Sequence, residues 1–349
     1  MMMTALPRPS LRVVRGEDDH GADVASVGSR IHHALVCLDR SAASELCLPY
    51  AQIVAEAFGA AITLTHVMPL QKPSPASRSR SDGLDWELER REAYQYLERA
   101  RERLEHRLGA TVRTALTQGV PADRIVATAH EVQADLTIVA SDARLVPHAG
   151  LVGGTALRVL ATSTGSVMLA QGSGSIPPQR IVVPLDGSAR TESALPAALS
   201  LARMYGAELS LVHVVREPPT TLVLADSDDI TLSQQLTRRL EKSAERYLER
   251  VRDGVLREVP RVRLVVRVRA DERRALLDLA THLRADLIVM AAHGSTCDVD
   301  NAFGSVVSYM LARSRVPLLV LQDVTRHDDA AEPTQAPRRV SQIRRKEDV

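Results

Sequence analysis

The sequence predicts an α/β protein built from two tandem, open, parallel five-stranded sheets, each with helices on both faces. Its 349 residues are enough for two domains with separate cores. Residues 39–67 and 186–214 are identical at 13 of 29 positions, which shows that the same unit occurs twice. In each unit, short apolar strands alternate with amphipathic helices, a pattern typical of a parallel sheet covered on both faces.

The elements of the second unit follow in order along the chain. The segment RIVVPL (180–185) is the first strand, and an Ala/Leu-rich helix follows it as far as Tyr205, where Gly206 ends the helix. Further strands are expected at 209–214, 262–268, 286–291 and 316–322, and further helices at 231–252, 272–283 and 304–313. The helix at 231–252 is charged, with apolar residues at 232, 236, 240, 244, 248 and 251. The first unit repeats this order, with its charged helix at 85–108.

The predicted boundaries are a disordered N-terminal tail (1–30), a first domain (31–171), a linker (172–178), a second domain (179–322) and a disordered C-terminal tail (323–349). The linker is rich in Gly, Ser and Pro, which is typical of a flexible connection. The C-terminal tail carries the basic cluster RRVSQIRRK (338–346), which we interpret as part of a solvated tail.

The composition argues against nucleic-acid and membrane partners. The net charge is +1 and aromatic residues make up 3%, so neither a basic field nor a base-stacking platform is expected. The chain has no run of about 18 apolar residues, and residues 1–30 lack the apolar segment of a signal peptide. Three scattered cysteines, Cys37, Cys47 and Cys297, form no disulfide framework and suit a reducing compartment. We therefore expect a cytoplasmic protein.

Two loops of the second unit are predicted to meet beyond the carboxyl ends of its strands, where open α/β sheets bind ligands. Asp186-Gly187-Ser188 follows the first strand, and the carboxylate can accept hydrogen bonds from a ribose or a base edge. The loop AAHGSTCDVDNAFGS (291–305) follows the fourth strand. Its glycines let backbone N–H groups approach a phosphate, and the helix beginning at Gly304-Ser305 adds its dipole. The Ser305 hydroxyl is either a further donor or the helix N-cap.

These residues resemble the universal stress protein family. The segments Pro184-x-Asp186-Gly187-Ser188 and ADLIVMAAHG…FGSV are similar to its motifs, and the resemblance covers nearly the whole chain apart from the tails. ATP-binding members carry Gly-x2-Gly-x9-Gly-[Ser/Thr] after the fourth strand, and this chain has Ala291-x2-Gly294-x9-Gly304-Ser305. The resemblance implies an adenine-nucleotide α-hydrolase-like fold that binds ATP, or an AMP-like adenine nucleotide, with or without Mg²⁺. The implied contact residues are Pro184, Asp186, Val214, Met290, Ala291, Gly294, Gly304, Ser305 and Val306.

Three residues of this loop depart from the family pattern. Ala291 stands in place of a glycine, and its methyl group is expected to hinder the approach of a ligand to the backbone. Asp298 and Asp300 lie near the expected triphosphate, where carboxylates lower affinity unless a divalent cation bridges them.

The first unit departs further from the pattern. Its equivalent loop (140–154) has Ala140 and Ala143 where glycines belong, and Gly153-Gly154 in place of Gly-Ser. Cys37 replaces the proline before Asp39, and Arg40 replaces the glycine after it. We interpret this unit as a copy that serves structure and pairing.

Other candidate sites have simpler interpretations. His293, Cys297, Asp298 and Asp300 lack the spacing of a zinc site, and a polar loop explains them. His66 and His213 recur at the end of the second strand of each unit, and we expect packed, hydrogen-bonded side chains rather than catalytic residues. We find no catalytic triad order, no paired catalytic carboxylates, no Walker motif and no GxGxxG after a strand, so neither a metal site nor an enzyme is predicted.

The leading hypothesis is a stress-response signalling or protective module whose second unit senses an adenine nucleotide and hydrolyses it slowly at most. The alternative is an interaction scaffold in which both sites have lapsed. A small-molecule hydrolase or transferase is a third hypothesis, for which no nucleophile or base is identified. Under each hypothesis, the resemblance implies pairing through the last strand of each unit, so the apolar edges 167–171 and 316–322 are predicted to pair antiparallel within the chain and to cover strand edges that would otherwise be exposed. A homodimer and an unidentified protein partner are left open.

Overall fold

A computed structural model describes residues 31–70, 80–140, 154–163, 165–172, 176–217, 227–255, 259–294 and 303–322. The two predicted tails and residues 173–175 of the predicted linker lie outside these ranges. Within them, no helix has the length and apolarity needed to cross a membrane.

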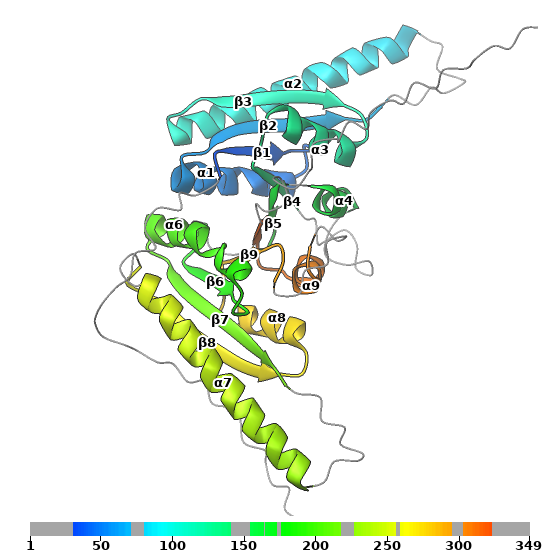
Figure 1. The fold of residues 1–349 in the computed structure, drawn as a ribbon. Helices are drawn as coiled ribbons and strands as arrows, with labels where there is room; N and C mark the ends of the chain where they lie inside the picture. The colour runs from blue at the N-terminus through cyan, green and yellow to red at the C-terminus, as the bar shows by residue number, and fades with distance from the viewer. Residues whose placement is uncertain are drawn as a thin grey trace, which may run out of the picture.

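The elements alternate between strand and helix in both units (Figure 1). The first unit contains β1 (His33–Cys37), the 3₁₀ turn η1 (Ser44–Leu46), α1 (Cys47–Phe58), β2 (Ala61–Met68), α2 (Arg80–Leu108), β3 (Val112–Gln118), α3 (Pro121–Glu131), β4 (Leu136–Ala140), α4 (Gly154–Thr162) and β5 (Ser166–Ala170). The second unit contains β6 (Arg180–Pro184), α5 (Ala189–Glu192), α6 (Leu195–Tyr205), β7 (Glu208–Arg216), α7 (Ser227–Val255), β8 (Val262–Arg269), α8 (Glu272–His282), β9 (Leu287–Ala291), α9 (Ser305–Arg313) and β10 (Leu318–Leu321).

The two five-stranded sheets join into one. The strand order is β3-β2-β1-β4-β5-β10-β9-β6-β7-β8, and the strands are parallel within each unit. β5 and β10 pair antiparallel, with Leu319 opposite Met168. The predicted pairing of the two apolar edges is therefore confirmed, and it covers an edge that each unit alone would leave open.

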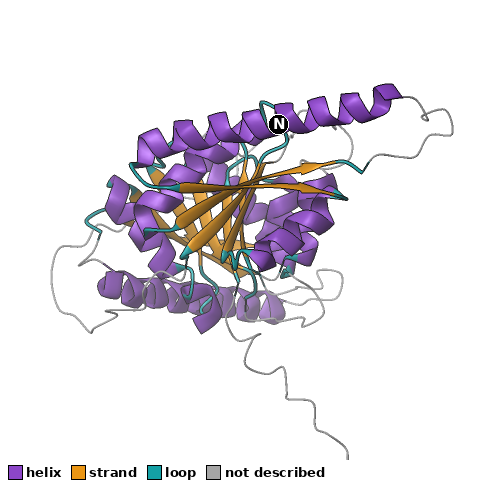
Figure 2. Ribbon diagram, turned by 90° about the horizontal axis from the view of Figure 1, so that it is seen from above, coloured by secondary structure: helices purple, strands orange, loops and turns teal. Residues whose placement is uncertain are grey.

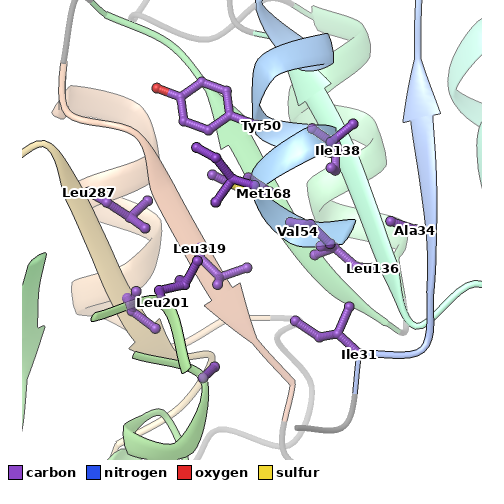
Figure 3. Packing of buried hydrophobic residues seen from close by; sticks show 14 of the residues in the cluster. Ile31, Ala34, Tyr50, Val54, Leu136, Ile138, Met168, Leu201, Leu287 and Leu319 are labelled. Carbon is purple, nitrogen blue, oxygen red and sulfur yellow. The ribbon is translucent and has the colours of Figure 1, made fainter. Parts of the chain in front are cut away.

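Helices cover both faces of the joined sheet (Figure 2). One apolar cluster contains buried residues of α1, α2, α6 and α7, and the other contains buried residues of α3, α4, α8 and α9. The first cluster runs through both units, and Figure 3 shows Met168 and Val54 of the first unit near Leu319 and Leu201 of the second. Burial of this shared core holds the two units together.

The helix expected after β6 is divided in two. A short helix, α5, ends at Glu192, and α6 begins at Leu195 with Pro196 in its first turn. Proline lacks a backbone N–H and is tolerated only where that donor has no helical partner, so α6 has to begin close to it.

The apolar stripe of α7 is only partly buried. Ala244 and Leu248 pack against the sheet, whereas Leu232, Leu236 and Leu240 are 65%, 45% and 40% exposed. The spacing explains the difference, because residues four apart advance by about 40° around a helix with 3.6 residues per turn. The stripe expected from the sequence therefore rotates away from the sheet toward the N-terminal end of α7.

Candidate functional site

The loop after β6 is held by its own hydrogen bonds. Oδ1 of Asp186 accepts three of them, from Ser188 N–H at 2.9 Å, Ser188 Oγ at 2.6 Å and Thr191 Oγ1 at 2.9 Å. The Ser188 hydroxyl also caps α5 by accepting from Thr191 N–H. Gly187 has a φ of +90°, a conformation that favours glycine. The Asp186 carboxylate is thus fixed at the carboxyl end of β6 without help from a ligand.

The loop after β9 lies against this carboxylate, as the neighbouring positions of β6 and β9 require. A Cβ added at Gly294 would lie 2.5 Å from Oδ2 of Asp186, closer than side chains tolerate. The two loops predicted to meet therefore do so. Close packing inside the protein is enough to explain the glycine at 294.

The N-terminus of α9 lies beside the same loop. Gly304 is the N-cap, with φ −64° and ψ 164°, and its N–H donates to the Ala292 carbonyl at 2.8 Å. Among the described residues, the nearest atom to an added Cβ would be that carbonyl oxygen at 3.5 Å, an ordinary contact distance. Neither the backbone conformation nor the packing against the described residues requires glycine here. The first N–H groups of α9, beginning with exposed Ser305, have no helical acceptor and can receive an anion.

Apolar side chains line one face of the sheet at this end of the strands. Side chains alternate along a strand, and the register partners and the packing of the clusters place Pro184, Val214 and Met290 on the face that α8 and α9 cover. Val306 of α9 packs against the same cluster. Ala291 follows Met290 in β9, so its side chain points to the opposite face, where it is buried. The methyl group expected to hinder a ligand therefore lies on the far side of the sheet from Met290.

Glu272, the first residue of α8, borders the site although the sequence did not predict it. Burial raises the pKa of Glu272, and the charge of Asp186 raises it further, whereas Arg216 and Arg273 lower it. All three charged residues thus lie within electrostatic reach of one half-buried carboxylate. The local sequence pattern does not predict that Glu272 lies near Asp186, because this proximity depends on β6, β7 and β8 lying side by side.

His213 lies on the other face, behind the Asp186 loop. Its ring meets Tyr247 edge-on, with 6.0 Å between ring centroids. Burial lowers the pKa of His213, and the charge of Asp186 opposes that shift. The predicted hydrogen bond is present at His66, whose Nδ1 lies 2.8 Å from a backbone carbonyl. At His213 the equivalent backbone acceptor is Leu185, which also acts to raise the pKa of the ring, although Nδ1 of His213 has no partner with full hydrogen-bond geometry among the described residues.

Of the four residues considered for a metal site, the structure describes one. His293 is buried, and Cys297, Asp298 and Asp300 lie outside the described residues. Among the residues that are described, no three His, Cys, Asp or Glu side chains gather closely enough to hold a metal ion. The absence of a metal site stays a prediction.

Comparison with known proteins identifies the family of the chain. The model of the universal stress protein family matches residues 30–171 and 178–322. The chain belongs to the universal stress protein family. It carries two tandem domains of that family, as the sequence motifs indicated.

The similarity to individual universal stress proteins is moderate. One from Mycobacterium tuberculosis is 29% identical over 130 residues, which are 37% of this chain and 43% of the relative's own length. A crystal structure of one from Archaeoglobus fulgidus superimposes with a TM-score of 0.58 at 20% identity, covering 84% of this chain and 99% of that chain. A universal stress protein crystallised in complex with cAMP covers 40% of this chain and 97% of its own, at 20% identity and a TM-score of 0.31.

The first domain of this universal stress protein has the aspartate loop in an altered form. Arg40 occupies the left-handed conformation, with φ 69°, where the second domain has Gly187. Burial acts to raise the pKa of Asp39, but hydrogen bonds from Ser41 and Ser44 outweigh it, so that the pKa is lowered. The loop that would form the phosphate cradle, including Ala143 and Gly153, lies outside the described residues.

A tyrosine and a glutamate approach each other beside the aspartate loop in both domains. Burial raises the pKa of Tyr247, and the nearby Glu192 carboxylate raises it further. Burial and the charge of Glu45 likewise raise the pKa of Tyr96. The sequence carries a signal for these tyrosines, because YLER occurs at both 96–99 and 247–250. We infer a supporting role for the pair, since it is present in both domains.

Proposed function

We propose that the second domain binds an adenine nucleotide, with ATP as the first candidate and an AMP-like nucleotide as the second. Binding would make the protein a nucleotide-responsive module of a stress response. The observation that carries this proposal is Gly304. It is a glycine that neither its conformation nor its packing against the described residues requires, placed where helix α9 offers N–H groups beside Asp186. A phosphate has to approach such N–H groups more closely than a side chain would allow.

The other predicted contact residues fit the remaining parts of such a ligand. The Asp186 carboxylate lies where ribose or base hydroxyl and amino groups can donate to it, and Val214, Met290 and Val306 offer an apolar surface. The cAMP found on another universal stress protein is an adenine nucleotide of the same kind. We expect binding rather than turnover, with hydrolysis slow and incidental, in a cytoplasmic protein that acts on an unidentified partner.

One observation favours the alternative, an interaction scaffold without a ligand. Gly294 is explained by its contact with Asp186, and Oδ1 of Asp186 already accepts three hydrogen bonds within its own loop. Those two residues would be needed in a scaffold as well. Gly304 is the residue at which the two hypotheses differ.

Calorimetry of ATP and AMP binding to the full chain, with and without Mg²⁺, tests the proposal. We expect saturable binding near one nucleotide per chain, lost in Gly304→Trp while the circular dichroism spectrum and the melting temperature are kept. A requirement for Mg²⁺ would point to Asp298 and Asp300 as groups near the metal. If millimolar nucleotide produces neither heat nor thermal stabilisation, the binding proposal is wrong and the scaffold remains.

A further inference from the structure

Arginines gather where β7 and β8 end, at the open edge of the second domain. Arg216 is the register partner of Arg269 in the parallel pairing. Neighbouring strands are about 4.8 Å apart, so the two side chains start next to each other on one face of the sheet. That face carries α8, because an earlier register pair on it, Val212 and Val265, packs in the cluster that contains α8.

This arginine pair borders the candidate nucleotide site. Val214, a predicted contact residue, precedes Arg216 on the same face. The Glu272 carboxylate lies within electrostatic reach of both Arg216 and Asp186. The surface therefore continues from the loop that would hold the nucleoside to the guanidinium groups at the edge.

The fold does not require this pair. Like charges side by side on neighbouring strands oppose folding. Among the described residues Arg216 makes no hydrogen bond or ion pair and only lies within electrostatic reach of Glu272, and Arg269 donates one hydrogen bond to the Val268 carbonyl at 2.9 Å. The first domain forms the other edge of the same sheet with β3, and there Pro69 occupies the position of Arg216 in the repeat. Val67, which matches Val214, has Thr117 as its register partner, where the second domain has Arg267.

We propose that the ligand of the second domain carries a second phosphate group, on the far side of its adenosine from Gly304, and that Arg216 and Arg269 bind it. This inference rests on the proposed nucleotide site and extends it. Paired guanidinium groups bind phosphate through several charge-assisted hydrogen bonds, which neutral residues at the same edge cannot supply. The second phosphate can belong to a bisphosphorylated adenosine or to a linear dinucleotide, because both place an anion beyond the ribose.

Titration calorimetry with three probes tests the inference on the full chain: AMP, adenosine 3′,5′-bisphosphate and the linear dinucleotide pApA. We expect at least one of the two longer probes to bind about ten-fold more tightly than AMP, equivalent to about 1.4 kcal/mol. The double variant Arg216→Gln/Arg269→Gln should lose that advantage and bind AMP as before. Arg113→Gln, at an exposed arginine of edge strand β3, is the matched control and should change nothing.

The outcomes separate this inference from the nucleotide site itself. If AMP and both longer probes bind equally well, the second phosphate site does not exist, although the nucleotide site does. If the advantage persists in the double variant, the arginines do not provide it, and the inference is overturned. If none of the probes and no ATP binds, both proposals are wrong. The double variant removes two adjacent like charges, so its melting temperature should equal or exceed that of the wild type.

Discussion

Replacing Gly304 by aspartate should stabilise the protein and strongly weaken nucleotide binding at the same time. Gly304 has the backbone conformation of an N-cap but no side chain to accept hydrogen bonds from the first turn of α9. An added Cβ would come no closer than 3.5 Å, at the Ala292 carbonyl oxygen, to any described atom outside its chain neighbours, so the described residues leave room for it. An aspartate can therefore cap the helix without displacing the loop, and it would put a negative charge where we place the phosphate.

The two effects differ in sign and in size. An aspartate N-cap in place of glycine is worth a few tenths of a kcal/mol, and its charge at the helix N-terminus adds about 0.3–1 kcal/mol. Together they should raise the melting temperature by about 2 °C in a domain of this size. A carboxylate about 4 Å from a phosphate costs about 4 kcal/mol at an effective dielectric constant of about 20. Nucleotide affinity should therefore fall by about 100-fold or more.

Differential scanning fluorimetry and titration calorimetry on the same preparations measure both effects. Val120→Asp is the matched control, because Val120 is the N-cap of α3 in the first domain and also lacks a side-chain cap. It should raise stability similarly and leave nucleotide binding unchanged. Undiminished ATP binding in Gly304→Asp would show that the phosphate does not lie at α9. A clear loss of stability would refute the N-cap argument.

Three further predictions concern the surroundings of the site. Gly294→Ala should destabilise the protein by about 1–3 kcal/mol in urea unfolding, because its Cβ would lie 2.5 Å from Asp186 Oδ2; an unchanged midpoint would mean that the carboxylate moves freely. Tyr205→Phe should lower the free energy of unfolding by at most about 1 kcal/mol, because the lost hydrogen bond to Glu56, 2.6 Å long, is exposed. A larger loss would indicate that this contact helps to order the junction between the domains. His213 has a lowered pKa in the folded protein, so the unfolded chain takes up the proton first and stability should decline below about pH 6.5. His213→Gln should lessen the decline in melting temperature between about pH 7.5 and pH 5.5. An identical decline in the variant would contradict the lowered pKa.

The sheet was predictable because its signals are local or repeated. Apolar strands separated by amphipathic helices define a parallel sheet wherever they occur. The duplication then supplied the junction, since each unit ended in an apolar strand and each of those strands needed a partner. These facts predict that β5 and β10 pair, but not the register that places Leu319 opposite Met168. The division of the helix after β6 also has a sequence signal, Pro196, although the apolar pattern predicts one continuous helix that includes it.

The electrostatic surroundings of the site were not predictable in the same way. Glu272 lies far from Asp186 in the sequence, and it borders Asp186 because β6, β7 and β8 are adjacent strands. Sequence patterns place Glu272 at the start of a helix but do not say which charges face it. The pairing of Arg216 with Arg269 likewise depends on register, which a shift of one residue would change completely.

The comparison between the two domains shows which residues bear on ligand binding. The first domain has an aspartate after its first strand, supported by serine hydrogen bonds, although its loop carries Arg40. An aspartate in this position therefore stabilises the loop whether or not a nucleotide binds, and Asp186 by itself is weak support for a ligand. Gly304 is different, because the protein would be at least as stable with a capping side chain there. Gly304 therefore lowers the stability of the free protein, and its packing against the described residues does not require glycine, so a bound ligand explains its presence.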